Sequence, residues 1–171
     1  MENEINRVKI GPSYPARNGS SELHDKGSEQ SQMEWHRDEF TITDERSKVQ
    51  TGAVAELLAK TYWGQKRPRQ AVEKLIPNSF CFSLLCDGKQ IGFARVVTDL
   101  TVFSWLSDLV INDHYRGKGL GRWFVDYILN HPEIAGTQFV LQTTQGHALY
   151  EKFGFQRSEK LMTRQPGTHP G

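Results

Sequence analysis

A glycine-rich turn between a strand pattern and a helix pattern constrains the fold of this chain most strongly. The apolar run 105–111 has strand character, and residues 120–128 carry apolar side chains at helical spacing. Between them lies the segment 115–121, which reads YRGKGLG. A tight turn from strand to helix brings the backbone N–H groups of the first helical turn around one point, where the helix dipole is positive. The turn therefore predicts an anion site, best suited to a phosphate or pyrophosphate.

The spacing of the glycines separates three kinds of phosphate loop. A Walker A loop requires Ser or Thr after its Gly-Lys pair, but Gly117-Lys118 is followed by another glycine. A dinucleotide-binding loop requires a third glycine at position 122, which is arginine. The pattern R-x-x-G-x-G fits Arg116, Gly119 and Gly121. A glycine loop without a ligand remains the alternative while this short motif stands alone.

A second pattern follows about thirty residues later in the chain. Residues 139–143 are rich in β-branched and aromatic side chains, which favours a short buried strand. The segment 146–155, GHALYEKFGF, then places Leu149 and Phe153 four residues apart on one helical face. Gly154 is positioned to end that helix. The order strand, glycine loop, helix, strand, helix is more specific than either pattern alone.

These two patterns resemble the GNAT superfamily of acetyl-CoA-dependent N-acetyltransferases. The resemblance extends from about residue 40 to residue 163 and rests on Arg116, Gly119 and Gly121 together with the LYEKFGF run. It implies contacts with acetyl-CoA from the strand before the loop, the loop itself and the second motif. These residues are Leu109, Val110, Ile111, Arg116, Gly117, Lys118, Gly119, Leu120, Gly121, Thr143 and Tyr150.

The sequence departs from the family pattern after the second of these strands. Relatives often carry an asparagine there that binds the pantetheine arm, whereas this chain reads Thr-Thr-Gln at 143–145. The contact would then come from a hydroxyl or an amide, or be lost. The resemblance also implies a bulge in the strand before the loop, and a V-shaped slot where that strand parts from the next.

The predicted fold is an α/β (α+β) domain with a mixed, mostly antiparallel sheet, helices on both faces, and a splay between the strands near 103–111 and 138–143. The predicted element order is β-α-α-β-β-β-α-β-α-β, which is also the order that the resemblance implies. The expected strands are 39–43, 80–86, 89–98, 103–111, 139–143 and 160–163, and the expected helices are 50–62, 68–75, 120–128 and 146–153. We predict a single domain at 38–165, a disordered extension at 1–37 and a flexible tail at 166–171.

The resemblance implies direct attack of an amine on the acetyl thioester, with coenzyme A leaving as a thiolate. Tyr150 matches the family's tyrosine that protonates this thiolate; the alternative is that it only packs against the pocket. Asp108 lies mid-strand among apolar neighbours, where an acidic residue is unusual. It could act as a base or anchor a cationic substrate, or it could form a structural ion pair with Arg95 that makes it a poor base. We predict Tyr150 and Asp108 as catalytic, and Tyr62, Trp63 and Arg95 as substrate-binding.

Composition narrows the possible partners. The net charge of +1 gives no support for nucleic-acid or membrane-surface binding, and no apolar run approaches the length of a membrane span. The six histidines lack metal-ligand spacing, so no metal is expected. Two cysteines without bridging geometry favour a reduced, cytoplasmic protein. A homodimer is compatible with the sequence but is not indicated by it.

Taken together, the motifs predict an N-acetyltransferase that modifies a small primary amine. Acetylation of a protein amine is one alternative, although no acidic cluster points to a basic partner. A domain that binds acyl-CoA without turnover, as a sensor or assembly module, is a second alternative. A nucleotide-binding regulatory domain is a third. The glycine loop constrains the donor and says nothing of the acceptor.

Overall fold

The computed structural model describes residues 33–164 of the 171-residue chain. Within that part, the chain forms a six-stranded sheet, four α-helices and three single turns of 3-10 helix. The elements are β1 (Glu34–Arg37), β2 (Phe40–Thr43), α1 (Thr51–Ala59), α2 (Arg69–Leu75), β3 (Phe80–Cys86), β4 (Lys89–Thr98), β5 (Phe103–Ile111), α3 (Leu120–Leu129), β6 (Gln138–Leu141) and α4 (His147–Tyr150).

The strands lie side by side in chain order from β1 to β6. Neighbours from β1 to β5 are antiparallel, whereas β5 and β6 are parallel. The parallel pairing joins residues 103–106 to residues 138–141 and goes no further, so the two strands part beyond Leu106. The mixed sheet and its splay between these strands confirm the predicted fold class.

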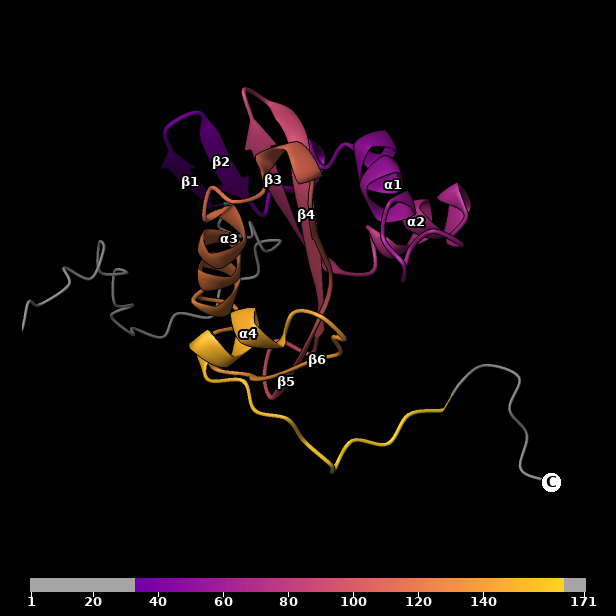
Figure 1. Cartoon of the computed structure of the whole chain (residues 1–171), viewed down its shortest axis with the longest axis vertical. Coiled ribbons are helices and arrows are strands. Elements are labelled where there is room, and N and C mark those ends of the chain that lie inside the picture. The colour runs from indigo at the N-terminus through magenta and orange to yellow at the C-terminus, as the bar shows by residue number, and fades with distance from the viewer. Residues whose placement is uncertain (1–32, 165–171) are drawn as a thin grey trace, which may run out of the picture. The chain divides into compact units, whose positions relative to one another are not determined.

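The helices cover opposite faces of the sheet because successive strand residues point to opposite sides. Phe82 and Leu84 of β3 pack in one core cluster with Phe124 of α3. Cys81 of β3 belongs to a second cluster with Val54 of α1. Figure 1 shows α3 on one side of the sheet and α1 and α2 on the other. The sheet therefore separates two layers of core, one beneath α3 and one beneath α1. The strand ends beside α3 can form a site.

A β-bulge interrupts the pairing of β4 with β5. Phe93 faces Val110 and Arg95 faces Ser107, so one residue of β4 opposes two residues of β5. Asp108 adopts a φ of 55° at this point, in the left-handed region that aspartate tolerates better than most residues. The bulge that the resemblance implies is thus present, and it lies directly before the strand segment that leads to the glycine loop.

Two predictions about the ends of the domain need correction. Residues 34–37, predicted to belong to a disordered extension, form β1 and pair with β2, because Trp35 packs edge-on against Tyr127 of α3 at a centroid distance of 5.1 Å. The strand predicted at 160–163 is wrong, since residues 155–164 form neither helix nor strand. The rest of the predicted extension and the tail at 166–171 lie outside the described residues. No helix in the described part is both long and apolar enough to cross a bilayer.

The second motif helix has nearly its predicted bounds, but it is not α-helical throughout. It consists of α4 and one further turn of 3-10 helix at Glu151–Phe153. Gly154 ends it with a φ of 83°, as the sequence predicts for a C-terminal glycine. Tyr150 is the last residue of α4.

Candidate functional site

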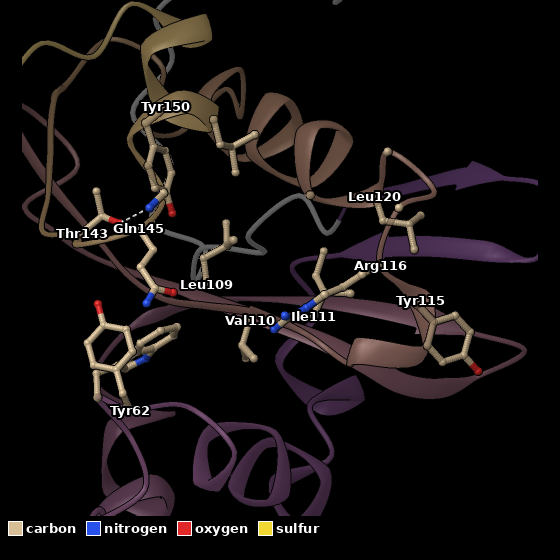
Figure 2. A pocket seen from close by; sticks show the side chains of 16 residues that line it. Tyr62, Leu109, Val110, Ile111, Tyr115, Arg116, Leu120, Thr143, Gln145 and Tyr150 are labelled. Carbon is tan, nitrogen blue, oxygen red and sulfur yellow. Dashed lines mark hydrogen bonds between the residues drawn. The ribbon is translucent and has the colours of Figure 1, made fainter.

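A cavity of about 460 Å³ opens where β5 and β6 part. It lies between β5, the glycine loop, the segment after β6 and the aromatic residues that follow α1 (Figure 2). The lining residues are Tyr62, Trp63, Leu109, Val110, Ile111, Tyr115, Arg116, Gly117, Gly119, Leu120, Gly121, Thr143, Gln145, Gly146, Leu149 and Tyr150.

The glycine loop has the backbone geometry that an anion site requires. A 3-10 turn at Asp113–Tyr115 carries the chain from β5 into the loop. Gly117 and Gly119 then adopt φ angles of 80° and 72°, which other L-residues adopt only with strain. Gly119 caps α3, and the first N–H groups of that helix have no intrahelical partner. These N–H groups, at the positive end of the helix, could hold a pyrophosphate at the mouth of the cavity.

The two basic residues of the loop differ in their placement. Arg116 lines the cavity and is exposed, with its Nη2 2.7 Å from the carboxylate of Asp113. Lys118 lies outside the cavity: its ammonium group is 5.6 Å from the ring centroid of Phe40 and 5.7 Å from that of Tyr115. The predicted contact of Lys118 with the ligand thus has no support from the cavity geometry, whereas Arg116 is well placed.

A residue of β1 supports the loop from outside. The guanidinium of Arg37 donates a hydrogen bond of 3.2 Å to the carbonyl oxygen of Lys118 and lies 4.7 Å from the ring centroid of Trp123. It therefore ties the N-terminal edge of the sheet to the start of α3. This contact could not be predicted from the sequence, because Arg37 lies 81 residues from Lys118 in a segment without clear periodicity.

The segment after β6 forms the wall opposite β5. Thr143 Oγ1 accepts a hydrogen bond of 2.8 Å from the N–H of Gly146, which folds the chain sharply into α4. A Cβ atom at Gly146 would lie 2.9 Å from both Thr143 Oγ1 and the ring of Tyr150, so only glycine fits without displacing that ring. Thr143 lines the cavity, and its hydroxyl, which accepts in this turn, still has its own hydrogen to donate to a ligand.

Tyr150 points from α4 into the cavity (Figure 2). Its ring packs edge-on against Phe155 at a centroid distance of 5.7 Å. Its hydroxyl has no hydrogen-bond partner among the described residues. Burial raises the pKa of Tyr150 to about 12, so the phenol stays protonated at neutral pH. The side chain is a proton donor with no competing acceptor.

Asp108 lies beside the cavity but does not line it. Its side chain is only 1% exposed, and one carboxylate oxygen is 2.6 Å from Nε of Arg95 and 2.8 Å from Nη1 of Arg67. Arg95 also donates to the hydroxyl groups of Ser79 and Ser107. This arrangement favours the structural ion pair over a base, and it places Arg95 away from the cavity as well. Arg67 could not be identified from the sequence because it lies 41 residues from Asp108, in the segment before α2.

Tyr62 and Trp63 line the cavity from the side of α1. Their rings meet edge-on at a centroid distance of 4.8 Å, and both side chains remain exposed. The hydroxyl of Tyr62 shares a hydrogen bond with Oγ1 of Thr144, so the pair spans the cavity from the α1 side to the β6 side.

A family model and a solved structure that match this chain both name the same family. The model of the GNAT acetyltransferase domain matches residues 77–157, which includes β3 to α4. A solved structure from Xanthomonas campestris pv. campestris, described as a candidate acetyltransferase of the GNAT family, is 30% identical, with a TM-score of 0.70. The alignment covers 74% of this chain and 92% of that one. The chain belongs to the GNAT family of acetyltransferases.

Two further proteins are similar to this GNAT chain at lower sequence identity. A curated protein of Gibberella zeae, described as a candidate acetyltransferase, is 25% identical over 116 residues, covering 56% of this chain. The match spans 65% of that relative, less than two thirds of its length. The structure of glucosamine-6-phosphate N-acetyltransferase from Arabidopsis thaliana is 19% identical, with a TM-score of 0.57 and coverage of 74% and 98% of the two chains. That likeness shows the fold alone.

Sequence reasoning missed some of the residues that build this GNAT site. Tyr115, Gln145, Gly146 and Leu149 all line the cavity. Tyr115 directly precedes the R-x-x-G-x-G pattern. Gln145 and Gly146 lie at the segment where the sequence departs from the family. In the described residues, no group of three or more His, Cys, Asp and Glu side chains has the geometry of a metal site.

The glycine loop of this GNAT domain yields a stability prediction. We expect Gly119→Ala to lower the free energy of unfolding by about 1–2 kcal/mol, because an L-residue is strained at a φ of 72°. For a chain of this size each kcal/mol lowers Tm by roughly 2–4 °C. The matched control is Gly52→Ala in α1, where a Cβ meets nothing within 4 Å and the backbone is helical. Calorimetric melting of both variants checks this, and an unchanged Tm for Gly119→Ala would contradict it.

Proposed function

We propose that this chain transfers the acetyl group of acetyl-CoA to the primary amine of a small molecule, in a ternary complex. The observation that carries the proposal is the continuous path from the glycine loop to Tyr150 along the free edge of β5. The loop would hold the pyrophosphate at one end of this path. Tyr150 would meet the thioester sulfur at the other end.

The unpaired part of β5 suits the pantetheine arm. Among residues 33–164, no strand is hydrogen-bonded to this strand beyond Leu106 on the side of β6, so its backbone groups at Leu109–Ile111 remain available to amides of a ligand. An extended arm with two amides can bind such an edge much as an added strand would. The same N–H groups would polarise the thioester oxygen as negative charge develops there.

The proposed reaction needs one attack, protonation of the leaving thiolate and loss of one proton from the amine. The amine lone pair attacks the acetyl carbonyl carbon, the new C–N bond forms, and the C–S bond breaks with its electron pair going to sulfur. Tyr150 donates its phenolic proton to that thiolate and regains a proton from water. The proton released by the amine leaves to solvent, since the paired arginines hold Asp108 away from the acceptor. The slot contributes mainly by holding both reactants in position.

The acceptor is proposed to enter beside Tyr62 and Trp63. These exposed rings present an apolar surface with a polar rim, which suits a small amine with an apolar or aromatic part. The Arabidopsis protein is described as a glucosamine-6-phosphate N-acetyltransferase, so this fold can accommodate a small amine. The hydrogen bond between Tyr62 and Thr144 narrows the entrance and disfavours a protein acceptor.

A thiol-release assay tests the proposal directly. The full chain is incubated with acetyl-CoA and a panel of small primary amines, and free thiol is followed with time. We expect amine-dependent thiol release for at least one chemical class in the panel. Binding of acetyl-CoA by calorimetry, without thiol release for any amine or basic peptide, would favour the non-catalytic acyl-CoA sensor. Binding of ATP in preference to coenzyme A would favour the nucleotide-binding domain.

A further inference from the structure

The hairpin of β1 and β2 holds the glycine loop from outside the cavity. Arg37 and Phe40 face each other across its turn. The guanidinium of Arg37 donates to the carbonyl oxygen of Lys118, and the ammonium group of Lys118 lies over the ring of Phe40. The hairpin therefore contacts both the backbone and the side chain of one loop residue.

The hydrogen bond from Arg37 fixes the direction of one peptide group in the loop. The peptide bonds of the described residues are all trans, so the C=O of Lys118 and the N–H of Gly119 point in opposite directions. With the carbonyl oxygen directed at Arg37, the N–H of Gly119 points away from β1. Gly119 lines the cavity, and its N–H donates to no backbone group among residues 33–164. This N–H is therefore available to an anion in the cavity.

The same peptide group would rotate easily if nothing held it. Its rotation changes ψ of Lys118 and φ of Gly119, and glycine adopts either sign of φ at little cost. Gly117, on the other side of Lys118, also has a positive φ, of 80°. The two glycines thus give the loop its shape but orient its N–H groups weakly. An anion that must first order such a loop binds less tightly, because the loop loses its conformational freedom on binding.

Arg37 is itself held in place by α3. Its guanidinium lies 4.7 Å from the ring centroid of Trp123. Trp123 belongs to the first turn of α3, where its N–H donates to the carbonyl oxygen of Gly119 at 3.1 Å. A planar guanidinium can stack on an aromatic ring and donate hydrogen bonds from its edge at the same time. Arg37 is therefore fixed relative to the peptide group that it orients.

We propose that Arg37 is a positioning residue for the donor, which keeps the N–H of Gly119 directed at the pyrophosphate of acetyl-CoA. This role rests on the proposed function, in which the loop binds that pyrophosphate. Arg37 does not line the cavity, so it acts through the loop backbone. Because β1 lies outside residues 77–157, the family match assigns Arg37 no role.

Calorimetric titration of the full chain carrying Arg37→Met tests the proposal. Methionine keeps an apolar stem against Trp123 but cannot donate to the carbonyl oxygen of Lys118. We expect Kd for coenzyme A to rise about ten-fold, the loss of one charge-assisted hydrogen bond, and Kd for pantetheine to stay unchanged. In turnover, KM for acetyl-CoA should rise while kcat stays the same. The matched control is Arg69→Met, which removes an exposed arginine of α2 and should change none of these values.

Two results for Arg37→Met would overturn the proposal. Unchanged affinity for coenzyme A would show that the loop does not need Arg37. Equal weakening of coenzyme A and pantetheine would show a general loss of structure. Titration of the wild-type chain distinguishes this proposal from the proposed function. If the wild type bound the two molecules equally, both would fail, whereas a wild-type preference for coenzyme A that Arg37→Met retained in full would contradict only the role of Arg37.

Salt separates orientation of the loop from simple attraction by the charge of Arg37. The screening length falls from about 10 Å at 0.1 M salt to about 3 Å at 1 M, so the attraction of a distant charge for the pyrophosphate is lost over this range. The direction of a peptide group does not depend on that attraction. We expect the ratio of Kd values between Arg37→Met and the wild type to persist at 1 M salt. A ratio that fell to one would mean that Arg37 acts by its charge alone, and the positioning role would be wrong.

Discussion

Replacing Asp108 with asparagine is expected to lower the free energy of unfolding by about 3–5 kcal/mol, as for other buried ion pairs that lose one partner. The carboxylate is almost fully buried and is the shared partner of Arg67 and Arg95. Asparagine keeps the side-chain shape and tolerates the positive φ at this position, so the change removes the charge alone. Two poorly solvated guanidinium groups would then repel each other. Urea unfolding should show a lower midpoint with an unchanged slope.

The control for this experiment is Asp113→Asn. Asp113 also pairs with an arginine, Arg116, but the two side chains are 67% and 68% exposed. We expect its effect on stability to stay within about 0.5 kcal/mol. Equal small effects for both variants would contradict the buried cluster. If the folded fraction of Asp108→Asn lost turnover together with the ascending limb of its pH–rate profile, Asp108 would be a base after all.

Replacing Tyr150 with phenylalanine is expected to lower kcat by about 10²–10⁴-fold, the usual contribution of a general acid. The phenol points into the cavity from α4, and burial raises its pKa to about 12. Phenylalanine preserves the ring and its packing on Phe155, so acetyl-CoA affinity should hardly change. Steady-state kinetics together with donor titration separate the two effects. Because the raised pKa lies far above neutrality, deprotonation of Tyr150 should not lower the wild-type rate between about pH 7 and pH 10.

Tyr127→Phe is the matched control for the loss of a phenol. Tyr127 lies buried on α3 and donates to the carbonyl oxygen of Met33, away from the cavity. Its loss should cost some stability, about 0.5–1.5 kcal/mol for one hydrogen bond, and leave kcat unchanged. If Tyr150→Phe turned over as fast as Tyr127→Phe, Tyr150 would only shape the pocket, which is the alternative that the sequence left open.

The parts of the fold predicted correctly are those determined by local signals. The hairpin at 80–98 has its predicted bounds because Asp87 and Gly88 both adopt positive φ angles, which matches the twist of a two-residue turn. The glycine loop and α3 were likewise predicted from local signals. Gly119 marks the cap, and Leu120, Phe124 and Ile128 mark the buried face.

The features that the sequence could not reveal depend on distant contacts. β1 is short and polar, and it is held by β2 and by the packing of Trp35 on Tyr127, 92 positions away. The ion cluster at the bulge similarly joins Arg67 to Asp108 across the second core layer. The strand that was predicted at 160–163 and is not formed shows the opposite case, a local signal without a distant contact to support it. The sequence predicts a strand at 160–163, but a strand also needs a neighbour to pair with, and these residues pair with none in the described part of the chain.

The most direct test of the account is the binding of coenzyme A compared with pantetheine, by calorimetry on the full chain. If the Arg116–Gly121 loop holds the pyrophosphate, coenzyme A gains charge-assisted hydrogen bonds that pantetheine cannot make. Two such bonds, at about 1.5–3 kcal/mol each, correspond to at least about a hundred-fold difference in Kd. We predict that difference in favour of coenzyme A. Equal affinity for the two molecules, or no binding of coenzyme A at all, would contradict the assignment of this loop and of the slot beside it.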